Sequence, residues 1–239
     1  RPDGIFHLRQ IFLSSVNRVL FIDRVHPEMM RALADKGFDC QEDYDSPYEA
    51  LRDKISGYVG IVIRSRVPMD AAMIAAANSL KWIARSGSGL ENIDLKAAEK
   101  AGVAVYNSPE GNRDAVAEHA IGMILSLFNK LCGADMEVRS GRWNREGNRG
   151  LELAERTVGI IGFGQMGSAF AQRLSGFGCT LMAYDKYKTG YAPDHVKEVE
   201  LQEIQSECDV ISLHIPLSEE THHFVDDQFI ESCAKFFYL

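Results

Sequence analysis

The sequence predicts an α/β protein built from two parallel sheets, and three observations support this. Short apolar runs alternate with segments of helical periodicity along the chain, which is typical of βα units. The apolar runs contain few polar residues, as expected for strands that helices cover on both faces. A glycine-rich turn at 162–167 joins one apolar run directly to a helix. We therefore expect a complete, small doubly wound domain followed by a second α/β unit.

Composition excludes several classes of protein. The chain has 239 residues, of which 46% are hydrophobic and 25% charged, so it contains enough apolar material for two compact domains. The net charge of −8, without a basic stripe, argues against nucleic acid or an anionic membrane as a partner. Because no apolar run reaches the length of a membrane span, we expect a cytoplasmic protein.

The five cysteines indicate neither a disulfide framework nor a metal site. Their number is odd, they are widely scattered, and none forms a C-x-x-C pair. We expect reduced thiols in the core and no bound metal.

The first half of the chain carries the pattern of a whole domain, which we place at 17–112. Apolar runs predict strands at 19–23, 38–40, 58–63, 81–84 and 103–106, with helices near 27–36, 47–54, 69–77 and 94–101. The sequence begins with Arg1, and strand periodicity starts only near Arg18. Residues 1–16 are therefore expected to be a tail outside the fold, or upstream translation.

The segment 113–131 differs from everything before it, because apolar residues occupy almost all of its helical faces. Such a helix is expected to be buried, either at an interface between domains or subunits or in the centre of a core. A polar, glycine-rich stretch at 140–150 follows, and we expect a linker there before the next α/β segment. The second domain is placed at 113–239.

The strongest motif is T-V-G-I-I-G-F-G-Q-M-G, in which a strand runs into Gly162, Gly164 and Gly167 and then a helix. The first glycine permits a tight turn, the second lets the backbone approach a diphosphate, and the third lets the helix pack closely on its strand. A diphosphate would bind at the helix N-terminus, beside Gln165 and Met166. The motif predicts a dinucleotide site.

A carboxylate follows the next strand of this unit. The apolar run 179–184 ends at Asp185, where a carboxylate would accept hydrogen bonds from the ribose hydroxyls of a dinucleotide. It would also repel a 2′-phosphate, so NAD is favoured over NADP, although Lys186 and Lys188 would weaken that exclusion. The alternative is that Asp185 is a solvated turn residue.

A third strand, near 208–213, opens into a polar loop that contains proline. Because ligands bind at the carboxyl ends of parallel strands, we expect this loop to line the cofactor through His214, Ile215, Pro216 and Thr221. By composition alone, His214 and the pair His222–His223 are more simply loop histidines, and their spacing matches no metal motif.

Four segments in order resemble the D-isomer-specific 2-hydroxyacid dehydrogenase family, which includes phosphoglycerate dehydrogenase and hydroxypyruvate reductase. They are S-G-S-G-L-E-N-I-D (86–94), N-S-P-E-G-N-R-D-A-V-A-E-H-A (107–120), the glycine motif, and S-L-H-I-P-L-S-E-E-T (212–221). The resemblance implies a flavodoxin-like substrate-binding domain followed by an NAD-binding Rossmann domain. It also implies a homodimer that interconverts 2-hydroxy and 2-oxo acids by hydride transfer to or from NAD.

The same resemblance implies a substrate site in the first domain. The backbone N–H groups of Ser88 and Gly89 would bind the substrate carboxylate, with Arg64 nearby, and Arg66 is a competing candidate. Glu91 stands where many members have Asp, a change that we expect to be tolerated.

The resemblance stops after the segment 226–232. Similar enzymes continue with a strand bearing Asn/Thr-x-x-Arg-Gly, and later with a Glu and a His that act as acid and base, whereas this sequence reads C-A-K-F-F-Y-L. We therefore assign no catalytic residue, and expect an incomplete Rossmann domain from a truncated or frameshifted reading frame rather than an evolved short form. Its strand 208–213 would be an unpaired edge, and the chain poorly stable and close to inactive. The alternative function is a non-catalytic NAD-binding protein or a remnant.

Overall fold

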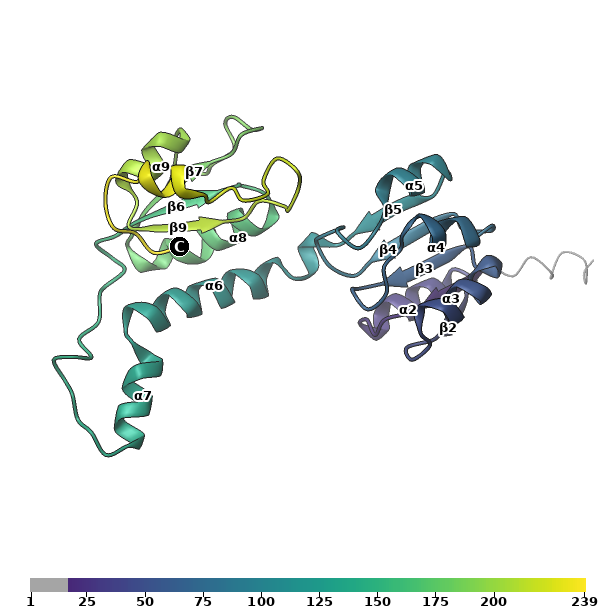
Figure 1. Ribbon diagram of the computed structural model, residues 1–239, viewed down its shortest axis with the longest axis horizontal. Helices are drawn as coiled ribbons and strands as arrows, with labels where there is room; N and C mark the ends of the chain where they lie inside the picture. The colour runs from purple at the N-terminus through teal and green to yellow at the C-terminus, as the bar shows by residue number, and fades with distance from the viewer. Residues whose placement is uncertain (1–16) are drawn as a thin grey trace, which may run out of the picture. The chain divides into compact units, whose positions relative to one another are not determined.

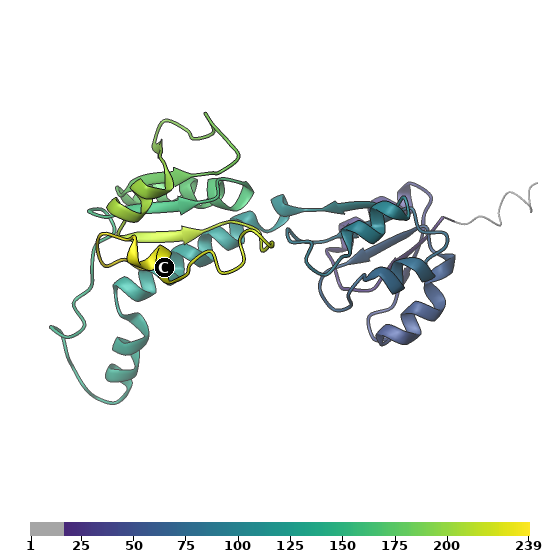
Figure 2. The same cartoon turned by 45° about the horizontal axis from the view of Figure 1, so that its top comes forward.

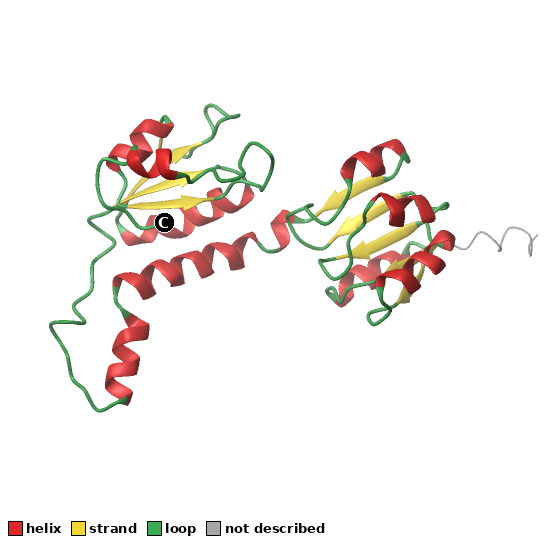
Figure 3. Ribbon diagram, in the orientation of Figure 1, coloured by secondary structure: helices red, strands yellow, loops and turns green. Residues whose placement is uncertain are grey.

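The computed structural model describes residues 17–239, in two compact units that divide between Gly111 and Asn112 (Figure 1). The tail expected at 1–16 lies outside the described residues. Both units are α/β, and each is built on one parallel sheet (Figure 3).

The first unit contains a five-stranded sheet in the order β2-β1-β3-β4-β5. Its strands are β1 (Arg18–Phe21), β2 (Asp39–Glu42), β3 (Gly60–Ile63), β4 (Trp82–Arg85) and β5 (Ala104–Asn107). Its helices are α2 (Pro27–Asp35), α3 (Tyr48–Lys54), α4 (Ala71–Ala76) and α5 (Leu95–Lys100), with short 3-10 turns η1 (Ile55–Gly57) and η2 (Pro109–Gly111). The strands and helices predicted from the apolar periodicity in this half are confirmed, with small differences at their ends.

Both faces of this sheet are covered, which explains why its strands are apolar at consecutive positions. Ile61 and Ile63 of β3 pack in one core cluster with side chains of α3, α4 and α5. Val62, between them, packs on the other face with Met29 and Leu33 of α2. Successive side chains of a strand point to opposite faces, so a strand buried on both sides needs an unbroken apolar run.

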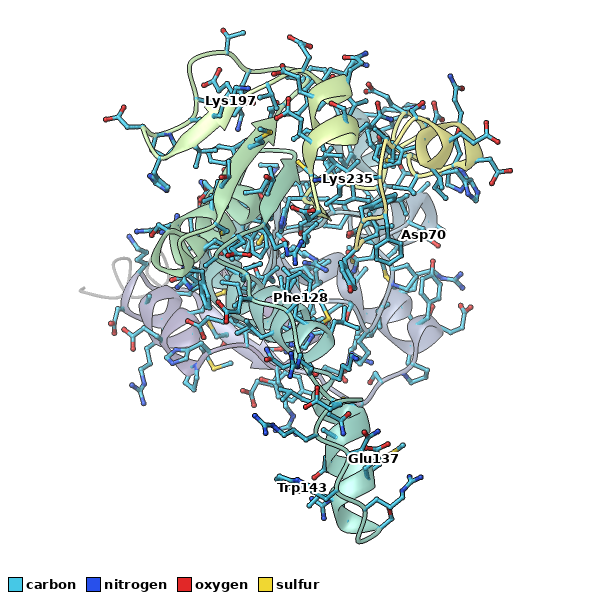
Figure 4. All side chains as sticks on the ribbon, turned by 90° about the vertical axis from the view of Figure 1, so that its left-hand side faces the viewer. Asp70, Phe128, Glu137, Trp143, Lys197 and Lys235 are labelled. Atoms are coloured by element: carbon cyan, nitrogen blue, oxygen red, sulfur yellow. The ribbon has the colours of Figure 1, made fainter. Side chains whose placement is uncertain are left out.

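Several helices begin at an aspartate whose side chain caps the first turn. Asp70, labelled in Figure 4, accepts a hydrogen bond at 2.8 Å from the backbone N–H of Met73. Asp94 and Asp226 make the equivalent contact at the starts of α5 and the later helix α10 (Asp227–Glu231). Such caps stabilise a helix start by about 1 kcal/mol each and explain where these short helices begin.

The second unit contains a four-stranded parallel sheet in the order β8-β7-β6-β9. Its strands are β6 (Thr157–Ile161), β7 (Thr180–Tyr184), β8 (Val196–Glu198) and β9 (Val210–Leu213). Its helices are α6 (Arg113–Phe128), α7 (Leu131–Arg139), α8 (Gln165–Leu174), α9 (Leu201–Glu207) and α10, with the 3-10 turn η3 (Ser175–Phe177). Strand β8 was not predicted, because its three residues V-K-E show no apolar run.

The helix expected to be buried all round at 113–131 is buried on one face only. Helix α6 ends at Phe128 and packs along α8 through Ala117, Ile121, Ile124 and Phe128 (Figure 2). On its other side Met123 is 52% exposed and Leu127 is 57% exposed. The alternative of a central core helix is therefore wrong, because the sheet and α8 cover a single stripe of the helix, and the alternative of an interface helix stays a prediction.

The linker expected at 140–150 lies inside the second unit. Leu151, just after this stretch, donates a backbone hydrogen bond at 3.0 Å to the carbonyl of Phe128. The Asn148 amide likewise donates to Glu137 at 2.6 Å, which ties the stretch to α7. These contacts explain why the units divide at Gly111 and Asn112 and not after α7.

The edge of β9 has a partner near the end of the chain. Tyr238 forms a parallel bridge with Val210, since its N–H donates to Asp209 at 2.9 Å and its carbonyl accepts from Ile211 at 2.8 Å. Its ring lies 5.0 Å from that of Phe128, centroid to centroid. The expectation that the strand at 208–213 has no neighbour is therefore wrong over 209–211.

The cysteines are free thiols, but they are not all core residues. Cys208 is buried, whereas Cys132 is exposed on α7 and the other three are partly buried. The expectation of reduced thiols agrees with this, whereas the expectation that all five lie in the core does not. Helix α7 buries none of its residues, so a small apolar side chain there has no core to enter.

Among residues 17–239, no single helix is long and apolar enough to cross a membrane. Helices α6 and α7 meet the length and composition criteria only when taken together, across a bend of 58°.

Candidate functional site

A cavity of about 490 Å³ opens at the carboxyl ends of β6, β7 and β9 in the second unit. Predicted cofactor-binding residues form much of its wall: Gly162, Gly164, Asp185, His214, Ile215, Pro216 and Thr221. Parallel strands place their carboxyl ends at one sheet edge, so three segments distant in the sequence meet there. Gln165, Met166 and Gly167 lie outside the wall, in the first turn of α8.

Each glycine of the turn occupies a position with a different constraint. Gly162 has φ of +90°, and a Cβ there would lie 2.7 Å from the carbonyl oxygen of His214. A Cβ on Gly167 would overlap the carbonyl oxygen of Gly162. A Cβ on Gly164 would meet no atom within 4 Å and would project into open space. Packing thus requires glycine at 162 and 167. At 164, no neighbouring atom of the described chain requires a glycine.

The start of α8 is prepared for an anion. Within residues 17–239, no side chain caps its N-terminus, so the first amides are left for another acceptor. The Gln165 side chain is already engaged, since its Oε1 accepts a hydrogen bond at 2.8 Å from Arg113. The amides of Gln165 and Met166 are therefore the groups that a diphosphate would use.

Asp185 is held rigidly at the end of β7. Its Oδ2 accepts from the backbone N–H of Phe163 at 2.8 Å, and its Oδ1 accepts from that of Tyr187 at 3.0 Å. The Lys188 ammonium lies 3.9 Å from Oδ2 and donates to the Phe163 carbonyl at 2.8 Å. The Asp185 side chain is only 11% exposed, so it is not a solvated turn residue.

His214 forms part of the support behind the glycine turn. Its ring lies 5.1 Å from that of Phe170, and its Nε2 is 3.0 Å from the Ser212 hydroxyl. Burial lowers the pKa of His214 to about 4, so the imidazole is neutral at physiological pH. His222 and His223 are exposed in the loop, and residues 17–239 contain no cluster of side chains that could hold a metal.

Besides Lys186, which the sequence already placed beside Asp185, the cavity wall includes residues that sequence reasoning missed: Ile161, Tyr184, Tyr187, Leu201, Ser218, Glu220 and Phe224. Glu220 accepts hydrogen bonds from both the Lys186 ammonium and the Tyr187 hydroxyl. The motif S-L-H-I-P-L-S-E-E-T contains Glu220, but nothing in it indicates this pairing. Leu201 was missed because it follows β8, the strand that was not predicted.

In the first unit, the two candidate arginines have different environments. The Arg66 guanidinium donates to the backbone carbonyls of Ile22, Asp43 and Ser46, at 2.8, 2.9 and 2.7 Å. The Arg64 guanidinium makes no hydrogen bond to the residues that the structure describes, and it faces a cavity of about 400 Å³. The Arg66 guanidinium is thus held by backbone carbonyls, whereas the Arg64 guanidinium is not, and both residues line this cavity.

The loop after β4 presents the other candidate groups. The Ser88 carbonyl accepts a hydrogen bond at 2.6 Å from the amide of Asn107, which fixes the loop to β5. The backbone N–H groups of Ser88 and Gly89 have no backbone acceptor within residues 17–239. The Glu91 carboxylate lies against Gly89, where a Cβ would overlap it. The Arg64 cavity is not lined by Ser88 or Gly89.

Comparison with known proteins shows which family this chain is similar to. Residues 121–239 match the family model described as the NAD binding domain of D-isomer specific 2-hydroxyacid dehydrogenase. D-3-phosphoglycerate dehydrogenase of Archaeoglobus fulgidus is 34% identical over 206 residues, which are 85% of this chain and 39% of that protein. The human D-3-phosphoglycerate dehydrogenase is 32% identical over 224 residues, or 93% of this chain and 42% of that protein. The chain thus spans about two fifths of these relatives' length.

Solved structures agree with the sequence comparison. D-lactate dehydrogenase from Escherichia coli has 29% identity and a TM-score of 0.71, and the match covers 90% of this chain and 70% of that chain. A glyoxylate reductase from Paecilomyes thermophila has 24% identity and a TM-score of 0.81, and the match covers 91% of this chain and 70% of that chain. At this identity the likeness shows the fold alone. The chain belongs to the D-isomer specific 2-hydroxyacid dehydrogenase family.

Proposed function

We propose that this chain carries the NAD-binding and substrate-binding regions of an oxidoreductase that interconverts a 2-hydroxy acid and its 2-oxo acid. One observation carries the proposal. The uncapped start of α8 faces open space at Gly164, while Asp185 is held at the end of the neighbouring strand. When bound, NAD would supply the hydride acceptor of the reaction.

The residues of the cavity fit the parts of NAD in order. The amides of Gln165 and Met166 would bind the diphosphate, and Gly164 leaves room for it. The remaining lone pairs of the Asp185 carboxylate would accept hydrogen bonds from the adenosine ribose. Apolar side chains of Ile215, Pro216, Leu201 and Phe224 would enclose the adenine ring.

NAD is favoured over NADP because Asp185 cannot turn away from the ribose. Two backbone N–H groups hold its carboxylate, so a 2′-phosphate would be placed beside a fixed negative charge. Lys188, which we expected to weaken this exclusion, is engaged by the Phe163 carbonyl.

We propose that the substrate carboxylate is bound by Arg64 together with the N–H groups of Ser88 and Gly89. The Arg64 guanidinium and the two N–H groups have no acceptor in the described part of the chain, although Ser88 and Gly89 do not line the cavity at Arg64. A guanidinium and two amides are a suitable receptor for an α-keto carboxylate in a protein of net charge −8. The Glu91 carboxylate beside Gly89 would confine the substrate anion to the opposite side of the loop.

We expect these 239 residues alone to bind cofactor and turn over little substrate. They contain no counterpart of the Arg, Glu and His that the family uses to stabilise the oxyanion and to transfer the proton. Losing the acid/base group alone costs about 10² to 10⁴ in rate. The alternative function is a non-catalytic NAD-binding protein.

Titration of the purified chain with NADH tests the proposal, with saturable binding as the expected result. A chain that binds neither NADH nor ADP-ribose would overturn it. Assay of turnover with hydroxypyruvate and glyoxylate then separates the two candidates. Turnover at ordinary enzyme rates by these residues alone would contradict our expectation of near inactivity.

We further propose a homodimer in the cytoplasm. The exposed side of α6 and the whole of α7 present the apolar residues Met123, Leu127, Leu131, Met136 and Val138. Trp143, labelled just beyond α7 in Figure 4, is 84% exposed. Many exposed apolar side chains on neighbouring helices are typical of a subunit interface. Five unpaired cysteines are usual in a reducing compartment.

A further inference from the structure

Hydrogen bonds join two of the loops that line the cavity of the second unit. Lys186 and Tyr187 follow β7, and Glu220 lies in the loop after β9, 34 positions from Lys186. The Lys186 ammonium and the Tyr187 hydroxyl both donate to the Glu220 carboxylate, and all three side chains line the cavity. This group also touches Asp185, because the Tyr187 N–H donates to the Asp185 carboxylate.

The charges at this end of the cavity are paired one to one. Lys188 lies 3.9 Å from Asp185, and Lys186 pairs with Glu220. The hydrogen bond from Lys186 lowers the pKa of Glu220, and the hydrogen bond to Glu220 raises the pKa of Lys186. Both groups are therefore charged at neutral pH, and neither ammonium is available to a ligand without losing its partner.

We propose that Glu220 is a specificity residue that excludes NADP, by holding Lys186 and by placing a second carboxylate beside Asp185 at the ribose end. This inference rests on the proposed function, because it assigns the ribose end of the dinucleotide to that part of the cavity. It assigns the exclusion of a 2′-phosphate to two loops acting together, and not to the carboxylate after β7 alone.

Removal of Glu220 would change what Lys186 can bind. A phosphomonoester carries nearly two negative charges at neutral pH. Beside Asp185 and Glu220 it meets repulsion and no free cation. Without Glu220, the side chain of Lys186, more than half of which is exposed, is free to turn to the phosphate. An exposed ammonium attracts a phosphate only modestly through water, so we expect the affinity for NADPH to rise about tenfold.

Calorimetric titration of NADH and NADPH, for the wild type and for Glu220→Ala, tests this inference. The variant is expected to bind NADPH about tenfold more tightly and NADH within about twofold of the wild type. Adding Lys186→Ala should abolish the gain for NADPH. Glu219→Gln, which removes the neighbouring exposed carboxylate outside the cavity wall, should change neither affinity.

Two further measurements separate specificity from simple loop support. Glu220→Gln keeps one acceptor oxygen where the carboxylate has two, and it loses the charge, so it should gain part of the NADPH affinity. Titration with 2′,5′-ADP and with ADP tests the ribose end alone. The variant Glu220→Ala should bind 2′,5′-ADP more tightly than the wild type does, and should bind ADP with unchanged affinity. An equal change for NADH and NADPH, or no change for NADPH, overturns the inference while leaving the proposed function intact. Failure of the wild type to bind NADH overturns both.

Discussion

Asp185 accepts a hydrogen bond at 2.8 Å from the backbone N–H of Phe163, the residue between the first two glycines of the turn. The end of β7 is thereby joined to the turn that follows β6. In the proposed function the same carboxylate binds the ribose, so its position and the shape of the diphosphate turn depend on each other.

Asp185→Asn should weaken both the fold and NADH binding. An amide offers one oxygen where the carboxylate offers two, so either the Phe163 or the Tyr187 N–H loses its acceptor. We expect a loss of about 1 to 3 kcal/mol in the free energy of unfolding, measured with urea, and weaker NADH binding by titration. Asp194→Asn, at an exposed loop position, is the control and should change neither. Unchanged NADH affinity in Asp185→Asn would contradict the assigned role.

The glycines at 164 and 167 should respond differently to alanine. Gly167→Ala forces a Cβ against the Gly162 carbonyl and should destabilise the unit by more than about 2 kcal/mol. Gly164→Ala meets no atom and should leave the melting temperature unchanged, yet reduce NADH affinity by about tenfold or more.

Thermal melts and NADH titrations check both variants. Gly176→Ala, also with open space at the Cβ position, is the matched control that should alter neither property. Full NADH affinity in Gly164→Ala would exclude the open space in front of α8 as the diphosphate site.

Stability should fall with acid because of His214. Its pKa of about 4 in the fold lies below the ordinary value of 6.5, so the unfolded chain binds the extra proton in that interval. The contribution of the neutral ring is complete above pH 6.5 and is lost as the pH falls toward 4. We expect a loss of about 2 kcal/mol between pH 7 and pH 5.

Urea unfolding at both pH values, for the wild type and for His214→Phe, measures this contribution. The variant keeps a ring against Phe170 but cannot be protonated, so its pH dependence should be smaller by that amount. His195→Phe, in an exposed loop, should retain the dependence of the wild type. Identical slopes for the wild type and His214→Phe would contradict the low pKa.

The loop between β7 and β8 should loosen when Glu198 is neutralised. Its carboxylate accepts hydrogen bonds from the backbone N–H groups of Ala192, Gly190 and Tyr191, which lower the pKa of Glu198. This contribution is present above the ordinary value of 4.5 and is lost as the pH falls through the lower folded value.

Glu198→Gln should therefore speed amide hydrogen exchange at 190–192 at neutral pH, with little change in the sheet. Glu207→Gln, at an exposed position in α9, should leave exchange in that loop unchanged. Equal protection of 190–192 in the wild type and Glu198→Gln would show that the carboxylate does not order the loop.

The dimer is tested on the exposed side of α6. Leu127→Glu places a charge at a residue that is 57% exposed in the chain, so the isolated fold should tolerate it. We expect light scattering to give the mass of two chains for the wild type and of one chain for the variant. Gln172→Glu on α8 is the control and should remain a dimer. A wild type of monomer mass would refute the proposal.

The pattern of residues predicted the central strands of both units, because strands buried on both faces leave long apolar runs. It also predicted the close contact between Gly167 and the turn, where a Cβ would overlap the Gly162 carbonyl, whereas the neighbour of Gly162 itself is His214, from the distant segment after β9. Strand β8 escaped prediction because only Val196 of its three residues is buried.

The sequence alone therefore determined what local chemistry specifies: the α/β class, the glycine turn, and the carboxylate one strand away. Tertiary structure decided between residues of the same kind. Phe128 is buried and Leu127 exposed because α8 covers one side of α6, and Arg66 rather than Arg64 is bound by carbonyls from neighbouring segments. The pairing of Lys186 with Glu220 and of Tyr238 with β9 joins residues at least 28 positions apart, and such contacts exist only once the sheet has assembled.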